Sequence, residues 1–153
     1  MRKGVLRKLR EQGRACNGMP AVAICGRPDW TADDLAFVCD AGFFVFFNEH
    51  DAVSTARRLS GDRRIEVDEA ARILKQSIGS SKLVITLGRL GAFILNGVPT
   101  PRFSRATPVD NKDTTGAGDR LVTYTAIESA QGASDEEALD RSVRAVSEEL
   151  SAR

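Results

Sequence analysis

The chain has 153 residues, enough for a single domain over residues 1–153, and its 22 lysines and arginines nearly balance 21 aspartates and glutamates. A formal net charge of +1 gives no overall field for nucleic acid or an anionic membrane, so we expect a partner of neither kind. The longest apolar run, AGFFVFF, is too short to cross a bilayer, and three cysteines at spacings typical of neither zinc sites nor redox pairs indicate reduced thiols in a cytoplasmic protein.

The first predicted elements alternate between helix and strand. Apolar residues at helical spacing indicate a short amphipathic helix over residues 2–12, and PAVAICG follows as a buried strand over residues 20–26. Thr31, with an aspartate three positions later, resembles a capping box and predicts a helix over residues 31–42 that ends at its glycine. FFVFF, residues 43–47, is apolar at every position, which suits a strand covered on both faces.

The middle of the chain repeats this alternation. DAVSTARRL predicts a helix over residues 51–59, and DEAARILKQSIGS predicts another over residues 68–80 with its apolar residues on one face. KLVITLG, residues 82–88, is a continuous branched run, and GAFILNG, residues 91–97, is expected to be its hairpin partner through the GRLG turn. Two prolines make residues 98–104 an edge strand or a loop.

The last third of the chain is expected to be helical, over residues 117–132 and 134–153. Ser134 caps the second of these helices with Glu137 as its capping-box partner. Strands that are apolar throughout and alternate with helices are typical of a layered α/β fold. The sequence therefore predicts a layered sheet, mainly parallel, with flanking helices.

The segment DTTGAGD, residues 113–119, precedes the first of these two helices and is rich in small residues. If Gly116, Ala117 and Gly118 form the helix start, their unpaired N–H groups and the positive end of the helix dipole converge on an anion. Asp119 would repel such an anion, so its expected role is to accept a proton from an attacking hydroxyl. The alternative for this loop is a structural turn before a helix, with no ligand.

Three stretches in order carry a family resemblance. DTTGAGD resembles the signature near the C-terminal end of the ribokinase-like (PfkB) carbohydrate kinases. FFNEHDA, residues 46–52, resembles the family's Asn-x-x-Glu segment, and VITLGRLGAFI, residues 84–94, resembles the strand and glycine turn that border the nucleotide. The resemblance spans about residues 20–145. It implies a truncated ribokinase-like fold that corresponds to the nucleotide-binding C-terminal half, without the N-terminal half and the lid.

The resemblance also implies site residues. Asp119 would be the catalytic base, and the hole for the γ-phosphate would consist of Gly116, Ala117 and Gly118. The ATP pocket would include Thr86, Gly88, Gly91 and Thr115. Magnesium would be organised through water by Asn48 and Asp51, for which a plain N-cap pair is the alternative. The last predicted helix is more charged than the family's helix at this place, so we expect the side of the ATP pocket that would receive the adenine to be open.

The implied function is the transfer of the γ-phosphoryl group of ATP, with Mg²⁺, to a hydroxyl of a sugar or sugar-like molecule. The sequence departs from the family at Asp51, where a glutamate is usual, and at Arg120, where a small residue is usual. The alternatives are a non-catalytic nucleotide-binding or assembly protein with a kinase fold, and an inactive fragment of a longer kinase. An uncovered sheet edge further predicts a homo-oligomer or a partner chain that covers it.

Overall fold

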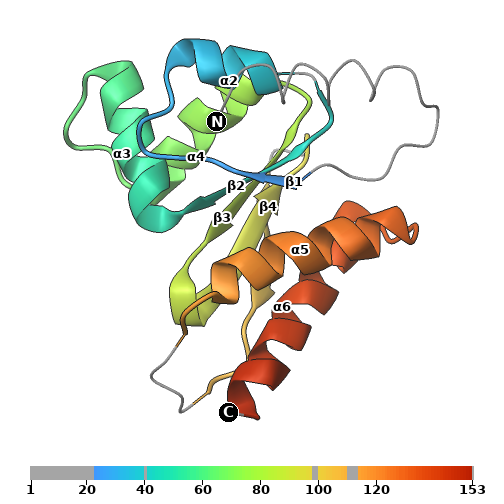
Figure 1. Ribbon diagram of the computed structural model, residues 1–153. Coiled ribbons are helices and arrows are strands. Elements are labelled where there is room, and N and C mark those ends of the chain that lie inside the picture. Colours follow the sequence, from blue (N-terminus) through green and yellow to red (C-terminus); the bar gives the residue numbers. More distant parts are fainter. Residues whose placement is uncertain (1–22, 40, 98–99, 110–113, 153) are drawn as a thin grey trace.

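The computed structural model describes residues 23–39, 41–97, 100–109 and 114–152. The predicted helix over residues 2–12 lies outside these residues. The described chain forms a five-stranded sheet in the order β1-β2-β3-β4-β5. Helices lie on both sides of this sheet (Figure 1).

The strands are β1 (Ala23–Cys25), β2 (Phe44–Asn48), β3 (Lys82–Thr86), β4 (Gly91–Leu95) and β5 (Arg102–Arg105). β1, β2 and β3 are parallel to one another, whereas β4 and β5 continue the sheet by antiparallel pairing. The predicted hairpin between β3 and β4 is confirmed, and the proline-containing segment provides the edge strand β5. The sheet is therefore mixed, and the layered α/β class is confirmed.

The helices form one layer on each face of the sheet. One layer contains α2 (Ala32–Val38), α3 (Glu49–Ser60) and α4 (Val67–Ile78), and the other contains α5 (Ala117–Ala130) and α6 (Asp135–Ser151) (Figure 1). In the part of the chain that the structure describes, no helix combines the length and apolar character needed to cross a membrane.

Strand β2 lies between the two layers and alternates between them. Phe44 and Phe46 belong to the core on the α5 and α6 side, whereas Val45 and Phe47 belong to the core on the α2, α3 and α4 side. All four side chains are at most 3% exposed. Because burying one such side chain contributes about 1.5–3 kcal/mol, this strand is a main source of cohesion between the layers.

Helix α2 begins as predicted but ends earlier. The Thr31 N–H donates to Asp34 Oδ2 at 2.9 Å and the Asp34 N–H donates to Thr31 Oγ1 at 3.3 Å, so the capping box is confirmed. The predicted end at Gly42 is wrong, because the helix ends at Val38. Cys39 at the C-cap is extended, with ψ 133°. The Val38 carbonyl oxygen accepts hydrogen bonds from the buried Ser81 hydroxyl at 2.7 Å and from the Ala41 N–H at 3.3 Å.

Candidate functional site

The candidate phosphate loop forms the start of α5. Gly116 is the N-cap residue and has φ +77°, in the left-handed region, so a residue with a Cβ would be strained there. No side chain caps α5, in contrast to α2, α3 and α6. The first N–H groups of α5 are thus left for another acceptor.

The backbone bonds decide which of these N–H groups are available. The Ala117 N–H donates to Thr114 O at 3.1 Å, and the Arg120 N–H makes the first helical bond, to Gly116 O, at 3.1 Å. Among the described residues, the N–H groups of Gly118 and Asp119 have no backbone acceptor. The expected loop therefore offers the amides of residues 118 and 119 at the positive end of the helix dipole, while that of Ala117 is already paired.

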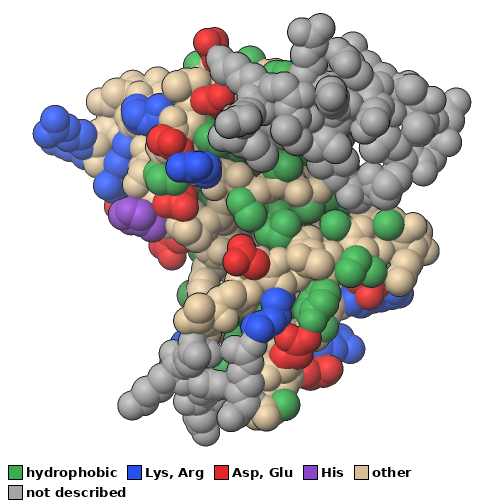
Figure 2. All heavy atoms as spheres, in the orientation of Figure 1, with side chains coloured by type: hydrophobic (Ala, Val, Ile, Leu, Met, Phe, Trp, Pro, Cys, Tyr) green, Lys and Arg blue, Asp and Glu red, His purple; other side chains and the backbone are tan. Residues whose placement is uncertain are grey.

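Asp119 is exposed in the first turn of α5. Within the described residues, its carboxylate has neither an ion pair nor a hydrogen-bond donor. Burial, and then the negative charge of Asp119, raise the pKa of the Cys25 thiol, which places the carboxylate near the end of β1. α5 packs beside β1, and hydrophobic side chains gather between them on the face seen in Figure 2. Ligands of parallel α/β sheets bind outside the carboxyl ends of the strands, so an exposed carboxylate at this place can meet a substrate.

A pocket of about 510 Å³ opens next to this helix start. It lies between the turn that joins β3 to β4, the segment after β5, the first turn of α5, and α6. It brings together six of the expected site residues, which are Asn48, Thr86, Gly88, Gly91, Ala117 and Gly118. Its volume is in the range of small-molecule and cofactor sites in proteins.

Four expected residues do not line this pocket. Thr115, Gly116 and Asp119 are each next to a pocket residue along the chain, whereas Asp51 lies three positions after the pocket residue Asn48. The fold also requires glycine at position 91, independently of any ligand. Gly91 has φ +117°, and a Cβ there would lie 2.0 Å from the Ser104 carbonyl oxygen. The close approach of β4 to β5 at the pocket edge therefore requires a glycine.

Asn48 and Asp51 bond to each other at the start of α3. The Asp51 N–H donates to Asn48 Oδ1 at 2.7 Å, and Asn48 Nδ2 donates to Asp51 Oδ2 at 2.8 Å. Asn48 is thus the N-cap of α3. Among the described residues there is no group of three or more His, Cys, Asp or Glu side chains that could hold a metal ion. Both polar atoms of the Asn48 side chain and Oδ2 of Asp51 are thus engaged in the cap, and the water-mediated magnesium role of the two residues stays a prediction.

The wall opposite the helix start was missed by the sequence analysis. Val143, Val146 and Leu150 of α6 line the pocket, together with Ala106 and Val109 after β5. An open adenine side was expected because α6 is rich in charges. The sequence does carry a signal for this wall. Apolar residues at positions 143, 146 and 150 are three and four residues apart, which places their side chains on one face of the helix.

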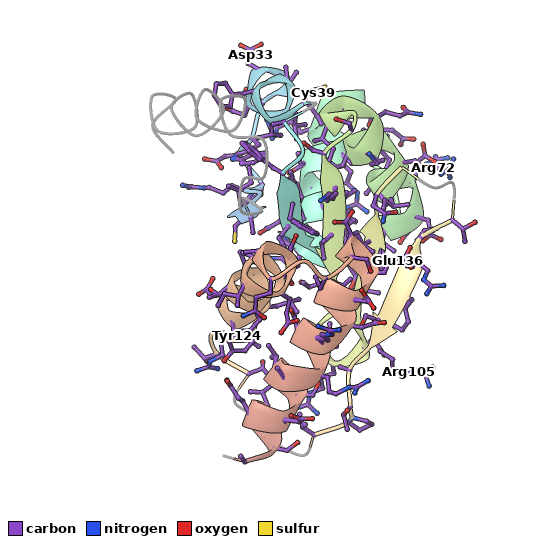
Figure 3. All side chains as sticks on the ribbon, turned by 90° about the vertical axis from the view of Figure 1, so that its right-hand side faces the viewer. Asp33, Cys39, Arg72, Arg105, Tyr124 and Glu136 are labelled. Carbon is purple, nitrogen blue, oxygen red and sulfur yellow. The ribbon has the colours of Figure 1, made fainter. Side chains whose placement is uncertain are left out.

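Arg120, which departs from the family pattern, is engaged on the α6 side of α5. Its Nε lies 3.2 Å from Glu149 Oε2. Tyr124 projects from α5 toward α6 (Figure 3) and donates its hydroxyl to Glu149 Oε1. This hydrogen bond, with burial and the charge of Glu149, raises the pKa of Tyr124, while Arg120 acts in the opposite direction. The arrangement joins α5 to α6.

In sequence, the family model described as pfkB family carbohydrate kinase matches residues 5–148. No curated protein sequence matches the chain.

Solved structures show the same fold. Ribokinase from Thermotoga maritima has a TM-score of 0.73 at 18% identity, with 95% of this chain and 47% of that chain covered. The tetrameric inhibited form of phosphofructokinase-2 from Escherichia coli has a TM-score of 0.68 at 24% identity, with 95% and 47% covered. Arabidopsis thaliana ribokinase complexed with ribose and ATP has a TM-score of 0.68 at 19% identity, with 93% and 45% covered. The chain thus spans a little under half the length of these structures.

Proposed function

The chain belongs to the pfkB family of carbohydrate kinases, and we propose that its pocket binds ATP for phosphoryl transfer to a hydroxyl of a sugar or sugar-like molecule. One observation carries this proposal. The pocket of about 510 Å³ joins the uncapped start of α5 to the glycine turn after β3. A helix start with unpaired amides suits phosphate, and the adjoining apolar space suits a nucleoside.

In the proposed reaction, Asp119 accepts the proton of the acceptor hydroxyl. The hydroxyl oxygen forms the new bond to the γ-phosphorus as the bond between that phosphorus and the leaving oxygen of ADP breaks. The amides of Gly118 and Asp119 stabilise negative charge on the transferring group. Asp119 suits the role of base because it is exposed and because one of those two amides is its own.

Thr86, Gly88 and Gly91 would border the nucleotide from the strand side, and Gly116 would shape the loop. Magnesium is proposed as the ion that accompanies ATP, because phosphate oxygens and water then supply most of its ligands. Asn48 lines the pocket and is the described residue through which a bound water could connect to that ion.

A second candidate function is nucleotide binding without turnover. It is favoured by the position of Asp119 beside β1, which is an edge of the described sheet. The described residues form a wall for the nucleotide but none that encloses an acceptor at Asp119. In this case the chain alone binds the nucleotide without turnover. Turnover would then need a second copy or a partner chain that pairs with β1 and completes the acceptor side.

The test is ATP turnover by the full chain with a panel of sugars, compared between wild type and Asp119→Asn. We expect Asp119→Asn to lower turnover about a hundredfold or more while ATP still binds by calorimetry. Asp33→Asn is the matched control, because Asp33 is an exposed aspartate in the first turn of α2 and lies far from α5 (Figure 3). Binding without turnover on every sugar supports the second candidate, and no ATP binding at all contradicts both.

A further inference from the structure

The apolar end of the pocket lies between two walls that come from different parts of the chain. The segment after β5 contributes one wall, and α6 contributes the other. The lining residues are Ala106, Thr107 and Val109 on the first wall and Val143, Val146 and Leu150 on the second. If the proposed function is right, the nucleoside lies between these walls. How firmly one wall is held against the other then affects how well ATP is bound.

Two backbone N–H groups hold the segment after β5 in place. The Ala106 N–H donates to the Leu90 carbonyl oxygen at 3.2 Å, which joins the segment to the turn between β3 and β4. The Thr107 N–H donates to Ser147 Oγ at 3.2 Å, which joins it to α6. The next residue, Pro108, has no N–H to donate. Ser147 thus links the two walls of the apolar end.

The Ser147 hydroxyl is prepared for this link by its own helix. It donates to the Val143 carbonyl oxygen at 2.8 Å, one turn earlier in α6, so its lone pairs remain for the Thr107 N–H. Ser147 is 4% exposed, so water competes little for the bond. Ser142 is a natural comparison, because it is buried too and donates to the Ala138 carbonyl oxygen at 2.6 Å, but it does not line the pocket.

We propose that Ser147 is a positioning residue for the nucleoside, because its hydroxyl fixes the segment after β5 against α6 in the arrangement that binds ATP. The inference rests on the proposed function and names a residue that acts through the pocket wall. A wall that is already in place need not be ordered on binding, so the link raises the affinity for ATP. Without the hydroxyl, the Thr107 N–H would turn to water part of the time, and only the attached fraction of the chain would bind ATP well.

The test is isothermal titration calorimetry of the full chain with ATP and Mg²⁺, for wild type, Ser147→Ala and Ser142→Ala. We expect Ser147→Ala to raise the Kd about three- to tenfold, which is the effect of about one net hydrogen bond. Ser142→Ala removes a buried hydroxyl from the same helix and should leave the Kd within about twofold of wild type. Thermal unfolding shows whether the two variants are equally stable.

An unchanged Kd for Ser147→Ala, or an equal rise in both variants, overturns the inference. The proposed function still stands in either case, because wild type binds ATP. If wild type does not bind ATP saturably, the proposed function fails together with the inference.

Amide hydrogen exchange, followed by nuclear magnetic resonance, measures the link directly and needs no variant. Coupling between binding events is reciprocal, so a link that favours ATP must itself be favoured by ATP. ATP should therefore slow the exchange of the Thr107 amide more than that of the Gly61 amide, which bonds within α3 at the end away from the pocket. Equal slowing of the two amides would overturn the inference. In Ser147→Ala the Thr107 amide should exchange faster than in wild type, and in Ser142→Ala it should not.

Discussion

Arg120 and Glu149 form an ion pair between α5 and α6, with Arg120 Nε 3.2 Å from Glu149 Oε2. The same carboxylate accepts the Tyr124 hydroxyl, so one α6 side chain binds two side chains of α5. Arg120 immediately follows the proposed base Asp119. The cation that departs from the family pattern is thus compensated by a carboxylate of α6.

Glu149→Gln should lower the free energy of unfolding by about 1 kcal/mol, because it removes the charge that compensates Arg120. The effect is limited by solvent, since the two side chains are 32% and 41% exposed. Urea denaturation measures it. Glu148→Gln changes the neighbouring exposed glutamate and should have no such effect. Equal stability of the two variants would show that the pair contributes nothing measurable.

Gly118→Ala should weaken ATP binding without loss of stability. A Cβ at Gly118 would meet no atom within 4 Å, so the folded chain accommodates it. Alanine is favoured over glycine in a helix by up to about 1 kcal/mol, and stability should stay equal or rise. The methyl group would stand where a phosphate must approach the amides of α5. Calorimetry and thermal unfolding measure the two effects, and unchanged ATP affinity would place the phosphate elsewhere.

Glu137→Ala should reduce the loss of stability at acid pH. Hydrogen bonds from the Ser134 N–H, at 3.0 Å, and from its hydroxyl, at 2.9 Å, lower the pKa of Glu137 in the folded chain. A lowered folded pKa gives a contribution that is present above the unfolded pKa and is lost as pH falls through the folded pKa.

The measurement is urea denaturation from neutral pH down through the ordinary glutamate pKa of 4.5. Wild type should be the more stable at neutral pH, and the difference from Glu137→Ala should shrink as pH falls. Alanine is used because glutamine also suits this capping position. A difference that stays constant with pH would mean that the charge of Glu137 does not support the cap.

Lys82→Met should destabilise the chain by about 1 kcal/mol, because Lys82 connects β3 to the first turn of α6. Its Nζ lies 2.6 Å from Asp135 Oδ1 and 4.4 Å from the centre of the Phe44 ring, and the two charged side chains are each 24% exposed. A double-mutant cycle with Asp135→Asn isolates the ion pair.

Arg72→Met is the control for this cycle, since Arg72 pairs with Glu69 within one helix and is 68% exposed. Its effect should stay below about 0.5 kcal/mol. An effect of Lys82→Met as small as that of Arg72→Met would mean that the first turn of α6 is held by its apolar contacts alone.

Much of the fold could be predicted because its signals are local. The capping boxes at Thr31 and Ser134 depend on residues three positions apart, and both are present. The FFVFF run is apolar at each position and is buried on both faces. The end of α2 was not predicted in the same way, because its last residue, Val38, bonds to Ser81, and no local pattern indicates a contact between residues 43 positions apart.

The sequence by itself determined the order of helices and strands, the family, and the glycine loop before α5, since each depends on residue types over a short stretch. Only the tertiary structure decided that α6 forms the apolar wall of the pocket, that Ser147 is paired with Thr107, and that Arg120 is compensated by Glu149. These pairs lie far apart along the chain, and no local pattern states which helix faces which. The physical reason is that hydrogen bonds and burial depend on distances between side chains in space, and the packing of the two helix layers on the sheet fixes those distances.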